Sequence, residues 1–246
     1  MNKEIKISVA MATYNGEKYI KEQLDSIINQ LEEDDEIVIC DDGSTDTTIE
    51  IIKEYIKNDN RIKLYCNNHV GVNLNFENAI SKCKNDVIML SDQDDIWEIN
   101  KVKEVKMKFI SSDCNMVLHN GKNFYEEKTH RNEDMLIPIM KHGVFSNVVK
   151  CCYWGCCMAF TKEFASAIIP FPKGIVAHDI WLGVIAEYIG KSEFINSNLV
   201  LHRIHDNNVT KKLSIYKKIE YRVNIIINFF KYKSTIKSKL NNIKKK

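Results

Sequence analysis

The chain is organised around the stretch Val87-Ile88-Met89-Leu90-Ser91-Asp92-Gln93-Asp94-Asp95-Ile96-Trp97. Its first four residues are apolar and bounded by polar ones, which predicts a short buried strand. Three carboxylates follow within four residues, just past the C-terminal end of that strand, where open α/β sheets bind ligands. Such carboxylates repel one another unless a positive charge lies between them, and a hard divalent cation takes oxygen ligands of this kind. The stretch therefore predicts a metal site at a strand end, with a solvated acidic turn as the alternative.

The same stretch excludes an EF-hand. Counted from Asp92, the sixth loop position is Trp97 where an EF-hand needs glycine, and the twelfth is Lys103 where it needs glutamate. We therefore expect a cation held at the strand end, in a position to share a phosphate group.

Length and composition indicate one large domain, alone or with an appendage. The chain has 246 residues, of which 44% are hydrophobic and 28% are charged, which is ample for a core. No run approaches the about 18 consecutive apolar residues of a membrane span, and no signal peptide opens the sequence. We therefore expect the chain in the cytoplasm.

Half of the eight cysteines lie in one short run, Cys151-Cys152-Tyr153-Trp154-Gly155-Cys156-Cys157. Zinc sites usually use pairs of cysteines separated by two residues, and this run contains no such pair. We therefore expect these thiols to pack in the core rather than to bind zinc.

The small net charge of +2 conceals an acidic body and a basic tail. Residues 211–246 carry 12 Lys or Arg against one acid, Glu220, whereas the rest of the chain has 23 bases and 32 acids. Ile219, Val223, Ile226 and Phe230 recur in the tail at helical spacing. A basic amphipathic helix either lies on an anionic membrane or packs on the domain with a solvated polar face, and no nucleic-acid motif accompanies it.

The first hundred residues alternate between strand and helix patterns, which predicts a parallel sheet with right-handed crossovers. Asn15-Gly16 breaks the first strand, and Ser44 or Asp46 is placed to cap the second helix. Strands are expected at 5–11, 36–40, 61–66 and 87–90, with helices at 17–30, from about 47 to 56, and at 73–84.

The second half of the chain is less regular. Residues 121–141 are polar and predict a mobile loop or excursion, and Thr161 is expected to cap a short helix that ends before Pro170. The remaining expected elements are helices at 100–110, 162–169 and 180–189, and strands at 115–119, 153–160 and 198–203.

Three motifs in order resemble the inverting family 2 glycosyltransferases: Ser8-Val9 with Thr13-Tyr14-Asn15-Gly16, Asp41-Asp42-Gly43-Ser44-Thr45-Asp46, and Ser91 to Trp97. The third motif is similar to the bacterial rhamnosyltransferase-like branch, as are Gly155 to Phe160, His178-Asp179-Ile180-Trp181-Leu182, and Arg203-x-His205-x-Asn207-Asn208-Val209. The resemblance covers about residues 5–210. It implies an α/β fold of the GT-A type, a Rossmann-like, mostly parallel central sheet flanked by helices. It also implies three divisions: a nucleotide-sugar-binding half at 1–100, an acceptor half at 101–210, and a basic helical tail at 211–246.

The resemblance also implies roles for individual residues. Asp94, Asp92 and His205 would bind Mg²⁺ or Mn²⁺, and Asp179 would be the base that deprotonates the acceptor. The expected contacts to the donor nucleotide come from Thr13, Tyr14, Asn15, Asp41, Asp42, Asp92, Gln93 and Arg203.

Structural alternatives stand beside several of these roles. The Asp41–Ser44 segment suits a tight turn with a helix cap, Asp179 suits an N-cap, and His205 suits a purely structural role. His178 is a weaker alternative to Asp179 as the base.

The resemblance implies a metal-dependent transferase that moves a sugar from dTDP-rhamnose or a UDP-hexose to a saccharide or lipid-linked saccharide. Such a reaction belongs to bacterial surface polysaccharide synthesis at the inner face of the cell membrane. The chain lacks the Gln-x-x-Arg-Trp motif of processive synthases, which favours transfer of one or a few sugars. The alternatives are a nucleotidyltransferase, whose glycine-rich basic loop is missing after the first strand, and a sugar-nucleotide-binding module without activity.

Overall fold

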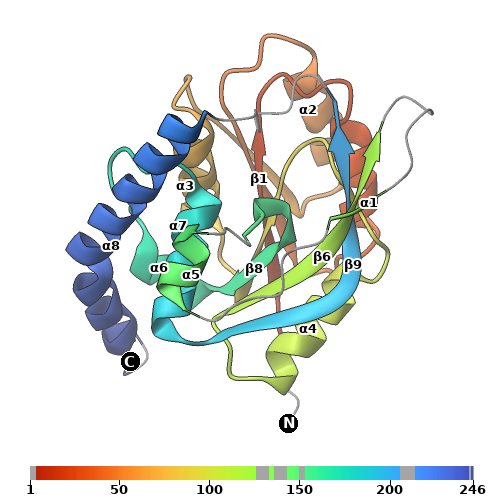
Figure 1. Ribbon diagram of the computed structural model, residues 1–246. Coiled ribbons are helices and arrows are strands. Elements are labelled where there is room, and N and C mark those ends of the chain that lie inside the picture. Colours follow the sequence, from red (N-terminus) through yellow and green to blue (C-terminus); the bar gives the residue numbers. More distant parts are fainter. Residues whose placement is uncertain are drawn as a thin grey trace.

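Nine strands of the described residues form one sheet, covered by helices on both faces (Figure 1). The computed structural model describes residues 4–125, 133–135, 143–149, 153–205, 214–243 and 245. The strand order is β3-β2-β1-β4-β8-β6-β9-β5, with β7 beside β6. The expected α/β fold is therefore present.

The first four strands are parallel and make the half of the sheet that the sequence predicted. They are β1 (Ile7–Thr13), β2 (Glu36–Asp41), β3 (Ile62–Cys66) and β4 (Val87–Ser91). β1 pairs with β2 on one side and with β4 on the other, because the chain crosses back over β1 after β3. A reversal of this kind leaves a crevice at the C-terminal ends of β1 and β4.

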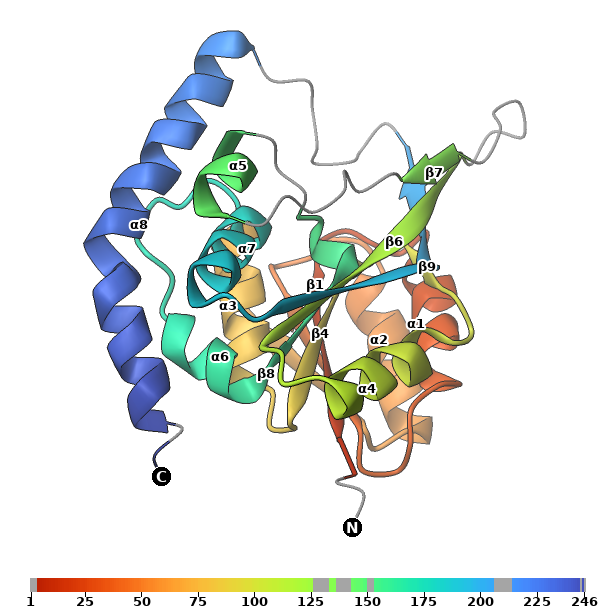
Figure 2. The ribbon, with the colours of Figure 1, turned by 60° about the horizontal axis from the view of Figure 1, so that its bottom comes forward.

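The second half of the sheet is mixed in direction. β6 (Met116–Tyr125) runs antiparallel to β8 (Met158–Thr161) and parallel to the long β9 (Ser192–Ile204). Figure 2 shows β6 and β9 crossing the molecule together. The short strands β5 (Ile96–Trp97) and β7 (Glu133–Met135) add to β9 and β6 respectively.

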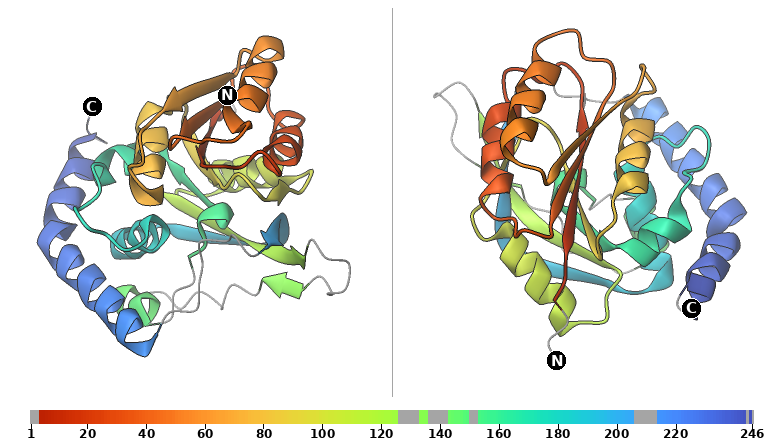
Figure 3. Two further views of the ribbon diagram at one scale, coloured as in Figure 1. Left: turned by 90° about the horizontal axis from the view of Figure 1, so that it is seen from above. Right: turned by 180° about the vertical axis from the view of Figure 1, so that it is seen from behind.

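Two hydrophobic cores lie on opposite faces of the sheet (Figures 1 and 3). One lies under α1 (Ile20–Ile28), α2 (Thr48–Asn58) and α4 (Lys101–Ser111). The other lies under α3 (Val72–Lys82), α5 (Val144–Val149), α6 (Lys162–Ile168) and α7 (His178–Ile189).

The C-terminal helix α8 (Ile215–Ile243) packs over α6 and α7 (Figure 1). Ile225, Phe229, Ile236 and Leu240 are buried on its inner face and belong to the core under α3, α6 and α7. Among the described residues, no helix combines the length and the apolar character that crossing a bilayer requires.

Two expectations for the second half were wrong in part. Residues 121–125 continue β6 as a strand, because β9 pairs with residues 122–125 and β7 with residues 121–123. The expected strand at 153–160 begins only at Met158, since the residues Gly155–Cys157 form a 3₁₀ turn. Residues 133–135 of the expected excursion form β7, whereas residues 126–132 and 136–141, Cys151-Cys152 and the Asn207-Asn208-Val209 ending lie outside the described residues.

Thr161 caps α6 as expected, because its side-chain oxygen accepts a hydrogen bond from the amide of Phe164 at 3.2 Å. Cys156 and Cys157 are buried, in line with packing in the core.

Candidate active site

The residues singled out from the sequence gather at the C-terminal ends of β1, β2 and β4, beside the crevice between β1 and β4. Backbone groups at strand ends are free of the sheet, and the loops that follow can present side chains to a ligand. The site has a side with Asp41 and Asp42 after β2, and a side with Asp92, Asp94 and Asp95 after β4.

Asp41 is fully buried and all of its hydrogen bonds are internal. Its Oδ1 accepts from the amides of Gly43 at 3.1 Å and Ser44 at 2.8 Å, and its Oδ2 accepts from the hydroxyls of Thr13 and Ser44 at 2.8 and 2.5 Å. A carboxylate has about four acceptor positions, so Asp41 is saturated. These bonds match the tight-turn alternative for this segment, and they also fix Thr13.

Asp42 holds a second loop in place. Its Oδ1 accepts from the amide of Val70 at 2.7 Å and its Oδ2 from the amide of Gly71 at 2.9 Å. Gly71 has a φ of +85°, a backbone conformation that suits glycine. Each carboxylate oxygen of Asp42 retains acceptor capacity for a further donor.

Gln93 links the loop after β4 to the loop after β1. Its Oε1 accepts from the amide of Tyr14 at 2.8 Å, and its Nε2 donates to the carbonyl of Tyr14 at 3.0 Å. A Cβ on Gly16 would lie 2.4 Å from Oε1 of Gln93, so only glycine permits this approach. The Tyr14 ring is 48% exposed at the mouth of the crevice.

Asn15 joins the loops after β1 and β2. Its side-chain oxygen accepts from the amide of Thr45 at 2.8 Å, and its own amide donates to the hydroxyl of Ser44 at 2.8 Å. Of the expected second-helix caps, Asp46 accepts from the amide of Thr48 at 3.0 Å, and the Ser44 hydroxyl instead bonds Asp41.

Asp92 and Asp94 are crowded carboxylates with few partners. Burial and the nearby charges of Asp95 and Asp94 raise the pKa of Asp92 to about 8. Burial and Asp95 also raise the pKa of Asp94, against the opposing effect of a hydrogen bond with His205. Oδ2 of Asp94 lies 2.9 Å from Nε2 of His205, which brings together two groups that are 111 residues apart.

Carboxylate oxygens with one imidazole nitrogen suit a hard divalent cation such as Mg²⁺ or, with the imidazole, Mn²⁺. A cation here would remove the repulsion that raises the pKa values of Asp92 and Asp94. The donor types of Asp92, Asp94 and His205 suit the expected metal, but among the described residues the group of three whose ligand atoms lie within 4.8 Å of one another is Asp95, Cys156 and His202.

Asp95 forms a buried ion pair that sequence reasoning did not identify. Its Oδ1 lies 2.9 Å from Nδ1 of His202 and accepts from the amide of Arg203 at 3.2 Å, while its Oδ2 has no hydrogen-bond partner among the described residues. Burial lowers the pKa of His202, but the bond to Asp95 outweighs this and raises it to about 11. Ligand atoms of Asp95, His202 and Cys156 lie within 4.8 Å of one another, so this group could also hold a cation.

Arg203 is buried on β9 and contacts the loop after β4 that carries Asp92, Asp94 and Asp95. Its Nε donates to the carbonyl of Asp94 at 2.9 Å, its guanidinium pairs with Glu22, and its guanidinium carbon lies 4.7 Å from the centre of the Tyr19 ring. The expected contact of Arg203 with the donor nucleotide would have to share the guanidinium with Glu22.

Asp179 lies in the first turn of α7 rather than at its N-cap, which is Ala177. Its Oδ1 accepts from the amide of Ile180 at 2.7 Å, and its side chain is half-buried. Asp179 also contributes to the raised pKa of Asp92, so the two carboxylates lie within electrostatic reach. The structure thus brings Asp179, from the second half of the chain, towards the carboxylates that follow β4.

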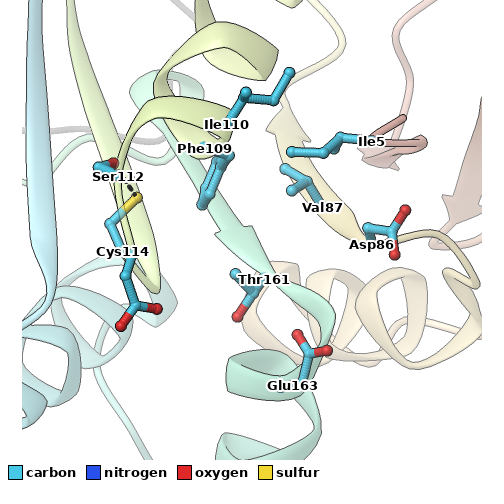
Figure 4. A pocket seen from close by; sticks show the side chains of 10 residues that line it. Ile5, Asp86, Val87, Phe109, Ile110, Ser112, Cys114, Thr161 and Glu163 are labelled. Atoms are coloured by element: carbon cyan, nitrogen blue, oxygen red, sulfur yellow. Dashed lines mark hydrogen bonds between the residues drawn. The ribbon is translucent and has the colours of Figure 1, made fainter. Parts of the chain in front are cut away.

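A separate cavity of about 410 Å³ lies at the opposite edge of the sheet (Figure 4). Ile5 and Val87, at the N-terminal ends of β1 and β4, line it together with Phe109 and Thr161. None of the residues expected to bind the metal or the donor nucleotide, or to act as the base, lines it.

The chain belongs to glycosyl transferase family 2, whose family model matches residues 8–168. It is 28% identical over 219 residues to an uncharacterised glycosyltransferase of Nostoc sp., covering 83% of this chain and 66% of that protein. It is 29% identical over 235 residues to the dTDP-rhamnosyl transferase RfbG of Shigella flexneri, covering 89% of this chain and 79% of that protein. The rhamnosyltransferase-like branch expected from the motifs is in line with this similarity.

Solved structures confirm the GT-A type of fold. Residues 1–349 of S. aureus TarS in complex with UDP-GlcNAc superpose with a TM-score of 0.72 at 18% identity, over 96% of this chain and 70% of that chain. The mannosyltransferase PcManGT of Pyrobaculum calidifontis, in complex with GDP-Man and Mn²⁺, gives 0.64 at 15% identity, over 97% and 75%. The chain spans 66% of the Nostoc relative and 32% of E. coli chondroitin synthase.

Proposed function

We propose that the chain is a metal-dependent, inverting glycosyltransferase that moves a sugar from a nucleotide sugar to a saccharide or lipid-linked saccharide acceptor. The observation that carries the proposal is the position of Asp179. A half-buried carboxylate in the first turn of α7 lies within electrostatic reach of Asp92, at the switch point of a sheet where nucleotides bind.

The donor side would hold the nucleotide. The exposed ring of Tyr14 can cover a nucleobase, and the spare acceptor capacity of Asp42 can take a base N–H. A Mg²⁺ or Mn²⁺ ion held by Asp94, Asp92 and His205 would take up the charge of the departing nucleoside diphosphate.

Inversion requires a single in-line displacement. The acceptor oxygen forms a bond to the anomeric carbon as the bond from that carbon to the phosphate oxygen breaks. Asp179 accepts the proton of the acceptor hydroxyl on the face opposite the leaving group. The carboxylate lies in the first turn of α7, at the positive end of the helix dipole.

The donor proposed first is dTDP-rhamnose, with a UDP-hexose second. The support is the similarity to RfbG, a dTDP-rhamnosyl transferase, and the likeness in fold to TarS, solved with UDP-GlcNAc. dTDP- and UDP-sugars both carry a pyrimidine base, whose ring N–H suits the acceptor capacity that the Asp42 carboxylate retains.

A donor-hydrolysis screen tests the proposal. The chain is incubated with dTDP- and UDP-sugars, with Mn²⁺ or with EDTA, and proton NMR records the anomer of the sugar released first. We expect metal-dependent hydrolysis of one donor class with inverted configuration. Retained configuration would contradict the mechanism, and metal-dependent binding of the nucleotide without any turnover would instead favour a sugar-nucleotide-binding module.

We also propose that the chain acts in surface polysaccharide synthesis, peripherally at the inner face of the cell membrane. While one face of α8 packs on the domain, another presents an exposed apolar stripe made of Tyr216, Ile219, Val223, Ile227 and Phe230. Between residues 214 and 243 the helix carries seven Lys or Arg against one acid. An apolar stripe with basic flanks suits an anionic lipid surface, where lipid-linked acceptors would be found.

Liposome flotation tests the membrane proposal with two matched variants. Replacing Ile219, Val223 and Ile227 by Ser removes the apolar stripe without touching the buried face of α8, whereas Met107→Ser and Ile110→Ser remove exposed apolar groups from α4. We expect flotation with phosphatidylglycerol vesicles that only the α8 variant loses. Equal flotation of both variants would contradict the proposal that α8 binds the membrane.

A further inference from the structure

Asn75 links helix α3 by hydrogen bonds to the ends of β1 and β2, where the nucleotide is proposed to bind. The buried side-chain amide of Asn75 donates to the carbonyl of Cys40 at 2.8 Å and to that of Thr13 at 3.3 Å, at the ends of β2 and β1. Its side-chain oxygen accepts from Asn67 at 2.7 Å. The start of α3 is therefore fixed relative to the strand ends where the nucleotide is proposed to bind.

The same turn of α3 reaches across to the base-bearing helix through Asn73. The Nδ2 of Asn73 donates to the carbonyl of Ile175 at 3.0 Å and to that of Val176 at 3.3 Å. Its Oδ1 accepts from the amide of His178 at 2.9 Å and lies 3.2 Å from Nδ1 of His178. One side chain thus holds the segment that leads directly into Asp179, more than a hundred residues away.

Asn73 supplies a hydrogen-bond acceptor at the N-terminus of helix α7. The first amides of a helix need an external acceptor, and the side chain of Ala177 offers none. Oδ1 of Asn73 provides that acceptor for the first helical amide, at His178. Substitution of Asn73 would therefore leave the amide of His178 without this acceptor, in the turn that carries Asp179.

The ring of His178 completes the contact. It stacks on Phe76 of α3 with ring centres 4.2 Å apart, and its Nε2 would lie 3.3 Å from a Cβ on Gly155. The ring is therefore held between α3 and the Gly155–Cys157 turn. This packing gives the first turn of α7 a defined position relative to α3.

We propose that Asn73 is a positioning residue that sets Asp179 at its working distance from the nucleotide, with α3 as the rigid spacer between them. The inference rests on the proposed role of Asp179 as base. Asn73 itself does not touch the nucleotide edge, which Asn75 holds, so its loss affects the geometry of the base and not donor binding.

The test compares Asn73→Leu with Asn73→Asp, which keeps an oxygen acceptor for the amide of His178 but loses both donors. Asn78→Ala on the same helix is the matched control. Steady-state kinetics give kcat and the donor KM, and calorimetry gives nucleoside diphosphate affinity at a temperature where every variant is folded. Because a misplacement of about 1 Å can cost about 100-fold in rate, we expect kcat of Asn73→Leu to fall about 10- to 100-fold.

We expect the donor KM and the nucleotide affinity of Asn73→Leu to stay within about twofold of the unmodified chain, since a group acting only on the transition-state geometry leaves binding unchanged. The kcat of Asn73→Asp should lie between that of Asn73→Leu and that of the unmodified chain. Gly155→Ala places a Cβ 3.3 Å from Nε2 of His178, on the ring edge away from Asn73. This variant should also lower kcat and leave the donor KM unchanged.

Two results would overturn the inference: a donor KM that rises in step with the fall in kcat, or a kcat of Asn73→Leu within about twofold of the unmodified chain. Asp179→Asn distinguishes this failure from failure of the proposed function. If Asp179→Asn is inactive and Asn73→Leu is fully active, only the role of Asn73 is wrong. If Asp179→Asn keeps its activity, the proposed base is wrong.

Discussion

The carboxylates after β2 and those after β4 are the same chemical groups at neighbouring strand ends, yet their surroundings differ. Asp41 and Asp42 accept six hydrogen bonds between them, four to Asp41 and two to Asp42, all from the loops around them. Asp92 and Asp94 instead lie near each other and near Asp95, and burial with like charge raises the pKa values of both. The first pair is held by hydrogen bonds within the fold, and the second set is the one that we propose binds a cation.

This comparison teaches that hydrogen-bond partners, rather than residue type, separate a structural carboxylate from a ligand-binding one. A carboxylate whose acceptor positions are filled by amides contributes to stability. One that is buried beside like charges destabilises the chain until a cation binds. The two sides of the site should therefore respond in opposite ways to the same substitution.

The largest expected effect is a loss of activity on substitution of Asp94, among the carboxylates after β4. Asp94→Ala should lower kcat/KM by about 100- to 1,000-fold, the range seen when one electrostatic stabiliser of a transition state is lost. In EDTA its melting temperature should equal or exceed that of the unmodified chain, because a source of repulsion has been removed. Differential scanning fluorimetry beside a kinetic assay checks both, and a marked loss of stability would show that Asp94 is structural.

A loss of stability is expected for substitution on the side of the site with Asp41 and Asp42. Asp41→Ala leaves the hydroxyl of Thr13 and the Gly43 and Ser44 amides without their acceptor, and should lower the free energy of unfolding by about 3 kcal/mol. Urea unfolding measures this. The control Asp34→Ala removes an exposed carboxylate that pairs with Lys6 and should change stability by less than about 1 kcal/mol. A loss no larger than that of the control would mean that the bonds to Asp41 do not stabilise the turn.

The pH dependence of stability separates the two sides further. The pKa of Asp92 is about 8 in the folded chain against an ordinary value of 3.8, so the folded state keeps a proton that the unfolded state releases. Without metal, the contribution of Asp92 to stability should therefore fall as the pH rises from about 4 to about 8. Urea unfolding in EDTA across this range should show a slope that Asp92→Asn reduces.

Adding Mn²⁺ should reverse this trend, because the cation binds the ionised carboxylates and releases their protons. The stabilisation by Mn²⁺ should then grow with pH, and it should be absent from Asp94→Ala. Stabilisation by Mn²⁺ that is the same at every pH would show that Asp92 and Asp94 are already ionised in the folded chain.

The smallest effect is expected at Asp42. Asp42→Asn keeps one acceptor oxygen but turns an amide group towards Val70 or Gly71, which should cost about 1 kcal/mol of stability. Nucleotide affinity should fall about tenfold, in line with one lost charge-assisted hydrogen bond to the base. Calorimetry with the nucleoside diphosphate measures the second effect, and unchanged affinity would remove Asp42 from the proposed donor contacts.

The strand ends could be predicted from the sequence because each apolar run stops at a cluster of polar residues. The edge of a parallel sheet then brings Thr13, Asp41 and Asp92 together without any knowledge of side-chain packing. The contacts that set their environment could not be predicted in this way. Asp95 with His202, Arg203 with Glu22, and Asn73 with His178 each join residues more than a hundred positions apart.

Periodicity was least informative where pairing across the sheet determined the structure. Residues 121–123 are Gly-Lys-Asn and gave no strand pattern, yet pairing with β9 and β7 continues β6 through them to Tyr125. In the tail, the spacing predicted one apolar face, whereas α8 buries Phe229 and exposes the adjacent Phe230. Which apolar residues of a helix face the domain depends on the partner surface, which the helix's own sequence does not contain.

The division of roles between the carboxylates is tested most directly by calorimetric titration of dTDP and UDP into three forms of the chain with Mn²⁺. We expect binding to the unmodified chain and to Asp179→Asn with similar affinity, loss of binding in Asp94→Ala and in EDTA, and loss of sugar transfer in both variants. Equal nucleotide binding by Asp94→Ala, with or without EDTA, would contradict the assignment of the carboxylates after β4 to a metal that holds the nucleotide.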